Sequence, residues 1–156
     1  MTKMAEVSIF ISYRRDDDSL RAVLLDLVIS GAFNEPSKPP KVRIFRDTCQ
    51  RLGVTWPKEL QEQISSADVV LVVIGPKWLE ARAEFERRRI DQTDDWVRQE
   101  IELARNSTVI PIAFGGARIP PTEALPQSIA YLSDKQGVEV RDEALESDLQ
   151  PVLLEI

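Results

Sequence analysis

Short apolar runs alternate with longer amphipathic stretches along the chain, and this alternation predicts its secondary structure. Apolar runs bounded by turn-forming residues are typical of strands that are buried on both faces. The predicted strands occupy residues 7–13, 41–45, 69–74, 109–114 and 138–140. Strands that alternate with helices pair in parallel through right-handed crossovers. The sequence therefore predicts a single α/β domain over residues 1–156, with a parallel sheet between two helical layers.

The stretches between these strands carry apolar residues at helical spacing. Residues 77–105 are predicted to be helical with a break at 91–94, and shorter helices are expected at 127–132 and 147–156. Pro111 lacks the N–H that a strand ladder needs, which favours a place near a sheet edge or at a bulge. The inward-facing residues are predicted to be Leu20, Val23, Leu24 and Leu27 in a first helix, after a polar turn at 14–19, and Trp56, Leu60, Ile64 and Ala67 in a second.

Residues 94–104 begin a fresh helical segment after the break and place an aromatic ring beside a carboxylate. Val97 and Ile101 belong to the stripe that seats this helix on the core. Trp96 and Glu100 are four residues apart, so they lie on a neighbouring stripe of the same face. A carboxylate beside an indole can hold a flat ligand and is suited to catalysis. The alternative, which this stretch alone favours, is an edge tryptophan and a solvated glutamate.

The composition excludes several classes of site. The chain has 20 Lys plus Arg and 26 Asp plus Glu, and its net charge of −6 argues against sequence-independent binding to nucleic acid or an anionic membrane. It has no histidine and a single cysteine, Cys49, so we expect neither a metal site nor Ser-His or Cys-His catalysis. One thiol cannot form an intramolecular disulfide, which favours a cytoplasmic location. No apolar run reaches membrane-spanning length, so no membrane partner is expected.

Five short motifs occur in order along the chain. They are FISYRR at 10–15, IFRD at 44–47, SAD at 66–68 before an apolar strand, WVxxEI at 96–101 and VIPI at 109–112. Neither G-x-G-x-x-G nor a P-loop is present, so a bound phosphate would have to meet arginines. With this order and spacing the chain resembles a Toll/interleukin-1 receptor (TIR) domain over nearly its whole length. Within that family it is most similar to bacterial TIR proteins that cleave NAD⁺.

The resemblance implies a flavodoxin-like three-layer fold with a central parallel five-stranded sheet in the order 2-1-3-4-5. It also implies an activity, the cleavage of the nicotinamide–ribose bond of NAD⁺ to nicotinamide and linear or cyclic ADP-ribose, in bacterial immunity or cell-death signalling. The glutamate that catalytic members use falls on Glu100. One alternative is a non-catalytic TIR–TIR interaction module, either a signalling adaptor or a mimic of host TIR domains. Another is a sensor that binds a nucleotide without cleaving it.

The remaining site residues come from the strand ends and the helix that carries Glu100. Arg14 and Arg15 lie where a pyrophosphate would lie, although pairing of one of them with the acids at 16–18 is an equally ordinary role. Trp96 is expected to stack on the ligand or to pack at the core edge. The other substrate-binding candidates are Tyr13 at the rim, Asp47, which could also cap the following loop, and the weaker candidates Ser12 and Lys77.

The family resemblance also implies partners. NAD⁺ is expected as substrate, and no cofactor or direct nucleic-acid partner is expected. Loop 48–54 corresponds to the BB loop, which in catalytic assemblies packs against a neighbouring TIR domain, so self-association is expected to activate the chain. This loop is one residue shorter than the usual form. No sensor region is visible in the sequence, so we expect activation by a separate sensor protein or by a sensor domain of a longer chain.

Overall fold

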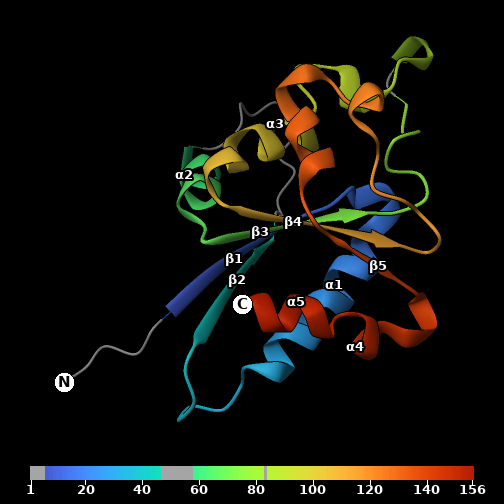
Figure 1. Ribbon diagram of the computed structural model, residues 1–156. Helices are drawn as coiled ribbons and strands as arrows, with labels where there is room; N and C mark the ends of the chain where they lie inside the picture. Colours follow the sequence, from blue (N-terminus) through green and yellow to red (C-terminus); the bar gives the residue numbers. More distant parts are fainter. Residues whose placement is uncertain (1–5, 47–57, 83) are drawn as a thin grey trace.

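A parallel sheet of five strands in the order β2-β1-β3-β4-β5 forms the centre of the protein (Figure 1). The computed structural model describes residues 6–46, 58–82 and 84–156. Every residue of β3, the middle strand, is buried, as its unbroken apolar sequence predicted. The strand order and the flavodoxin-like α/β class expected from the sequence are confirmed. The strands are β1 (Glu6–Ser12), β2 (Lys41–Arg46), β3 (Val69–Ile74), β4 (Thr108–Phe114) and β5 (Val138–Val140).

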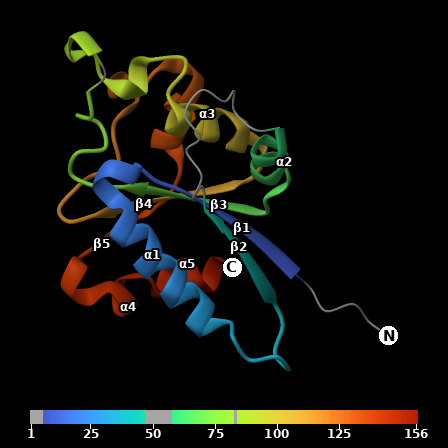
Figure 2. The same cartoon turned by 180° about the vertical axis from the view of Figure 1, so that it is seen from behind.

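Helices cover both faces of the sheet (Figures 1 and 2). One layer holds α2 (Lys58–Ser66), α3 (Trp96–Leu103) and the 3₁₀ segment Gln127–Asp134. The opposite layer holds α1 (Arg15–Ala32), α4 (Leu145–Asp148) and α5 (Gln150–Glu155). Alternate strand residues enter the two cores, because neighbouring side chains of a strand point to opposite faces. Shorter 3₁₀ turns lie at Glu84–Glu86, Arg89–Asp91, Ala104–Asn106, Thr122–Ala124 and Asp142–Ala144.

Helix α1 rests on the sheet through a different stripe from the one predicted. Ala22, Leu25 and Ile29 are fully buried, whereas Leu20 and Leu27 are 71% and 63% exposed. Both stripes obey helical spacing, because this helix is apolar on several sides, so periodicity could not choose between them. The helix also begins earlier than expected, at Arg15, inside the predicted polar turn, and its backbone kinks at Asp18.

The segment after β3 is not the helix that the sequence predicted. Residues 77–82 and 84–95 form a turn and two short 3₁₀ turns, and an isolated bridge pairs Arg82 with Arg88. Trp78 and Ile90 are fully buried and anchor this irregular segment in the core. A regular helix starts only at Trp96, where the sequence predicted a fresh segment.

Two further expectations concern the C-terminal half of the chain. Pro111 pairs with Val72 of β3, and β4 lies near an edge of the sheet, as expected, because only β5 of the described strands lies beyond it. The pairing of β4 with β5 begins only at Ile112, so Pro111 removes no hydrogen bond between β4 and β5. The terminal helix predicted at 147–156 is divided into α4 and α5, and Pro151 lies in the first turn of α5, where its missing N–H is tolerated.

Candidate functional site

A pocket of about 360 Å³ opens beside the carboxyl end of β1 and the N-terminal half of α3. Strand order reverses between β1 and β3, and such a switch point is the usual ligand site of an open parallel sheet. The pocket is lined by Tyr13, Arg14, Arg15 and Asp16 after β1, by Arg89, Gln92, Asp94 and Asp95 before α3, and by Trp96, Val97 and Glu100 on that helix.

Helix α3 places Glu100 at the inner wall of this pocket. Val97 and Ile101 of the same helix are buried in the core, as the stripe predicted, and they fix the rotation of the helix. Glu100 is only 3% exposed, whereas Trp96, one turn earlier, is half-buried and packs against the core edge. The solvated-glutamate alternative is therefore wrong. A carboxylate buried in a pocket wall acts on a bound positive charge through little intervening water.

The start of α3 is fixed by Asp95. Its side chain accepts a hydrogen bond from the backbone N–H of Arg98 at 3.1 Å, which satisfies a donor that the first helical turn leaves open. The same carboxylate accepts two bonds from the terminal nitrogens of Arg14, at 2.8 and 3.0 Å. One aspartate thus ends the preceding loop, starts the helix and joins it to β1.

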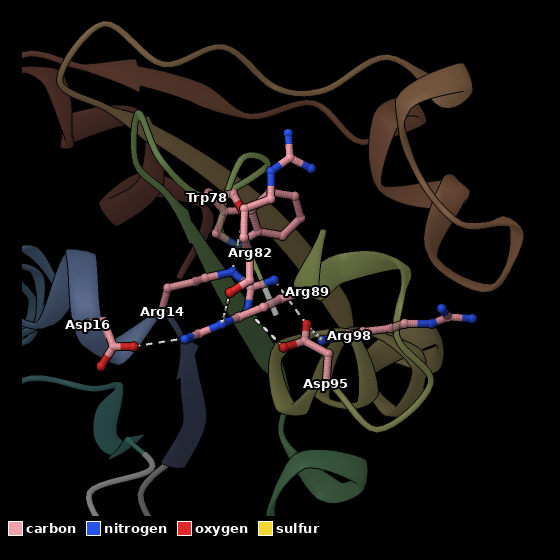
Figure 3. Close-up of polar contacts among 7 residues, drawn as sticks. All are labelled: Arg14, Asp16, Trp78, Arg82, Arg89, Asp95 and Arg98. Atoms are coloured by element: carbon pink, nitrogen blue, oxygen red, sulfur yellow. Dashed lines mark hydrogen bonds and ion pairs between the residues drawn. The ribbon is translucent and has the colours of Figure 1, made fainter. Parts of the chain in front are cut away.

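The side chain of Arg14 is almost wholly enclosed by protein, with 3% of its surface exposed. Figure 3 shows Arg14 with Asp95 and Trp78. Besides its two bonds to Asp95, its Nε donates to the backbone carbonyl of Trp78 at 3.2 Å, and its Cζ lies 5.9 Å from the centre of the Trp78 ring. Its ion pair is therefore with Asp95 and not with the acids at 16–18, which the sequence had offered as alternative partners. Arg14 lines the pocket, but its donors are directed at the protein.

A second ion pair lies at the pocket and is far more exposed. Nη1 of Arg89 lies 3.0 Å from a carboxylate oxygen of Asp16, and Nε of Arg89 donates to the backbone carbonyl of Arg82 at 3.1 Å (Figure 3). The Arg89 and Asp16 side chains are 42% and 67% exposed. This pair joins the first turn of α1 to the segment that precedes α3.

Beneath the first turn of α1, Asp18 packs against the end of β3. Its carboxylate is 1% exposed and accepts a hydrogen bond from Arg21 at 3.0 Å. Burial raises the pKa of Asp18, and the bond from Arg21 opposes that rise. A Cβ at Gly75 would come within 2.1 Å of this carboxylate, so the close contact between helix and strand requires glycine there.

The structure brings together Tyr13, Arg14, Arg15, Trp96 and Glu100 of the predicted site residues. Ser12 is fully buried and Lys77 is exposed, and neither is among the residues that line the pocket. Asp47, loop 48–54 and Trp56 lie outside the described residues.

Sequence reasoning missed Asp95, Arg89 and the pocket role of Asp16. Asp95 had a local signal, since an aspartate before an amphipathic run is a typical N-cap. Arg89 had none, because three consecutive arginines at 87–89 read equally well as solvated surface. Within the part of the chain that the structure describes, no group of three or more Cys, Asp or Glu side chains is placed to hold a metal ion. In that same part, no helix has the length and apolar character that crossing a membrane requires.

The family model of the TIR domain matches residues 9–150. This chain belongs to the TIR domain family. It is similar over 96% of both chains, at 10% identity and a TM-score of 0.57, to the TIR domains of the activated Roq1 resistosome, which directly recognises the pathogen effector XopQ. It is also similar to a prokaryotic SEFIR domain, at 17% identity and a TM-score of 0.57, over 95% of this chain and 90% of that one. These structural matches show the fold of this TIR domain. No curated protein sequence matches the chain.

Proposed function

We propose that this TIR domain is an NAD⁺ glycohydrolase that releases nicotinamide and leaves linear or cyclic ADP-ribose. The observation that carries the proposal is the placement of Glu100, a carboxylate 3% exposed on α3 in the wall of a pocket at the sheet's switch point. The glutamate of the W-x-x-x-E spacing, which the TIR resemblance marks as essential, is the residue that lies there. The proposal includes a role in bacterial immunity or cell-death signalling and activation by self-association.

The reaction places a specific demand on the site. The bond between C1′ of the ribose and the pyridinium nitrogen breaks, and its electron pair neutralises the nicotinamide ring, so the leaving group needs no proton. Positive charge then develops on the ribose, and a fixed carboxylate stabilises it. In hydrolysis, water adds to C1′ and loses a proton. The low exposure of Glu100 suits this role, because its charge is weakly screened by solvent.

The other pocket residues fit a ligand that is flat at one end and anionic in the middle. Trp96 and Tyr13, both partly buried, line the pocket and supply aromatic rings for contact with a ring or the ribose. Arg15 and Arg89 line the same pocket and are candidates for phosphate contact. Arg14 is best assigned to positioning α3, since its donors are directed at Asp95 and the Trp78 carbonyl. NAD⁺ is the substrate in this proposal, and no further cofactor is needed.

Nicotinamide release from NAD⁺, followed across protein concentration, tests the proposal. We expect release that rises more than linearly with protein concentration, because the active form is an assembly. Glu100→Ala should lower kcat by a factor of about 10² or more, the scale seen when a main electrostatic contact is removed. Glu102→Ala is the matched control, since Glu102 lies on the same helix, is paired with Arg98 and does not line the pocket. Equal loss in both variants, or no release at any concentration, would contradict the enzyme.

A TIR–TIR interaction module without catalysis is the second candidate. It is favoured by the leucines that α1 leaves in solvent, Leu20, Leu24 and Leu27, because a stripe of this kind is suited to contact with another protein. This candidate predicts concentration-dependent association of the wild-type chain with no nicotinamide produced. Activity that Glu100→Ala abolishes, with association unchanged, would favour the glycohydrolase.

A further inference from the structure

The charges that line the pocket do not, as they stand, suit an anionic ligand. Among the residues that the structure describes, three arginines and four carboxylates line it, so these residues carry one more negative than positive group. A dinucleotide brings a pyrophosphate, whose negative charge this balance repels. A site for such a ligand therefore needs a cation that can exchange a carboxylate partner for a phosphate.

Arg14 is poorly suited to that exchange. Its side chain and that of Asp95 are 3% and 8% exposed, and Asp95 also caps α3. If Arg14 turned to a phosphate, a buried carboxylate would lose its partner, and the free-energy cost of such a loss is large. Its Nε would also leave the Trp78 carbonyl.

Arg89 can exchange its carboxylate partner for a phosphate, because that partner, Asp16, is exposed to solvent. Asp16 is 67% exposed, so its carboxylate is hydrated as soon as the pair opens, and exposed pairs of this kind contribute little to stability. The bond from Nε of Arg89 to the Arg82 carbonyl holds the base of the guanidinium, while its end reaches toward Asp16 (Figure 3). The terminal nitrogens are thereby oriented before any ligand arrives.

The neighbouring arginines do not share this arrangement. Arg88 forms two bonds to Asp91, at 2.8 and 2.9 Å, and does not line the pocket. Arg98 is bonded to Glu102 and to the backbone carbonyl of Asp91. Arg89 thus differs from Arg88 and Arg98 in lining the pocket, and from Arg14 in the exposure of its ion-pair partner.

We propose that the ion pair between Asp16 and Arg89 is an exchangeable latch for the anionic group of a dinucleotide. Asp16 holds the end of Arg89 in the ligand-free protein, and a phosphate displaces it. The guanidinium then forms charge-assisted bonds to phosphate oxygens, which are stronger than its bond to a hydrated carboxylate. The identity of the ligand rests on the proposed function, while the exchange at Arg89 rests on the geometry of the pair.

Binding of ADP-ribose, measured by calorimetry, tests the latch without any catalytic step. Asp16→Asn removes the competitor and should tighten binding by about two- to fivefold, the range that corresponds to an exposed ion pair. Arg89→Gln should weaken binding by about tenfold or more, as expected for the loss of a charged hydrogen bond. In the double variant the gain from Asp16→Asn should vanish, because the two residues act through one interaction.

Two neighbouring residues provide matched controls. Asp17→Asn removes the same charge from the same turn of α1, and Arg88→Gln removes the same charge from the same segment, but neither residue lines the pocket. Both controls should bind ADP-ribose as the wild type does. The latch is wrong if Arg89→Gln binds like Arg88→Gln, if Asp16→Asn binds like Asp17→Asn, or if the wild type binds no ADP-ribose.

Nicotinamide release separates a failed latch from a failed enzyme. Nicotinamide riboside has the same glycosidic bond as NAD⁺ but no phosphate, so Arg89→Gln should raise the KM for NAD⁺ and leave that for the riboside unchanged. If NAD⁺ is cleaved but ADP-ribose binding does not depend on Arg89, the latch is wrong and the glycohydrolase stands. If ADP-ribose binding depends on Arg89 and nothing is cleaved, the latch stands and the glycohydrolase is wrong.

Discussion

Arg14 and Asp95 are 81 residues apart in the sequence and form a two-bonded ion pair at the point where β1 ends and α3 begins. Asp95 is also the N-cap of α3, so the pair fixes the start of that helix against the sheet. Glu100 follows on the same helix and lines the pocket beside Arg14. The position of the candidate catalytic carboxylate relative to β1 therefore depends on this buried contact.

Substitution of Asp95 by Asn tests the pair, since Asn remains a good N-cap and only the ionic contact is lost. We expect the free energy of unfolding to fall by about 3–5 kcal/mol, because Arg14 is left buried and unpaired. Urea denaturation measures the change. Glu6→Gln, which breaks an exposed pair with Arg43, is the control and should cost about 1 kcal/mol or less. Equal effects of the two substitutions would show that the buried pair contributes little.

Gly75 and Gly31 should respond to alanine in opposite directions. A Cβ at Gly75 would lie 2.1 Å from the Asp18 carboxylate, so Gly75→Ala should lower the free energy of unfolding by about 2 kcal/mol or more. Gly31 lies in α1 with nothing within 4 Å of a Cβ, so Gly31→Ala should raise it by about 0.5–1 kcal/mol. Thermal unfolding of both variants checks the signs, and a stable Gly75→Ala protein would contradict the close contact.

Asp148 should make the stability of the fold depend on pH in the acidic range. Two bonds from the Arg141 side chain and one from its backbone N–H lower the pKa of Asp148 to about 2. Because the folded pKa lies below the ordinary value of 3.8, the contribution is present above that value and is lost as the pH falls toward 2. The difference in urea stability between wild type and Asp148→Asn should therefore stay constant from pH 7 down to about 5 and shrink as the pH falls from there toward 2. A difference that stays constant with pH would rule out this linkage.

Trp96 should affect substrate use more than its packing alone explains. In the proposed enzyme, Trp96→Phe keeps an aromatic face and should retain most of kcat/KM, whereas Trp96→Ala should lower it by about tenfold, a typical value for a lost aromatic contact. Leu79→Ala is the control, since Leu79 is also half-buried against the same core but does not line the pocket. A similar loss of activity in Leu79→Ala and Trp96→Ala would show that Trp96 contributes through core packing and not through contact with the substrate.

The strands and the helix that carries Glu100 could be predicted because their signals are local. The apolar run of β3 was predicted with the bounds that the structure has, and the other strands within one residue at each end. The irregular structure at residues 77–82 and 84–95 could not be predicted, because it depends on Trp78 and Ile90 both entering the same core. Helical propensity in such a stretch is a weak term, which the burial of two large side chains outweighs.

The sequence by itself determined the order of the elements and the pairing of Trp96 with Glu100, since both follow from spacings within a few residues. Only the tertiary structure decided which stripe of α1 packs on the sheet and which arginine has an ion-pair partner that is exposed to solvent. The first depends on how α1 packs against β2 and β3. The second depends on contacts between residues 64 to 81 positions apart, as between Arg14 and Trp78 or Asp95. A local pattern carries no information about such distances, because they are set when the strands align and bring the ends of the elements together.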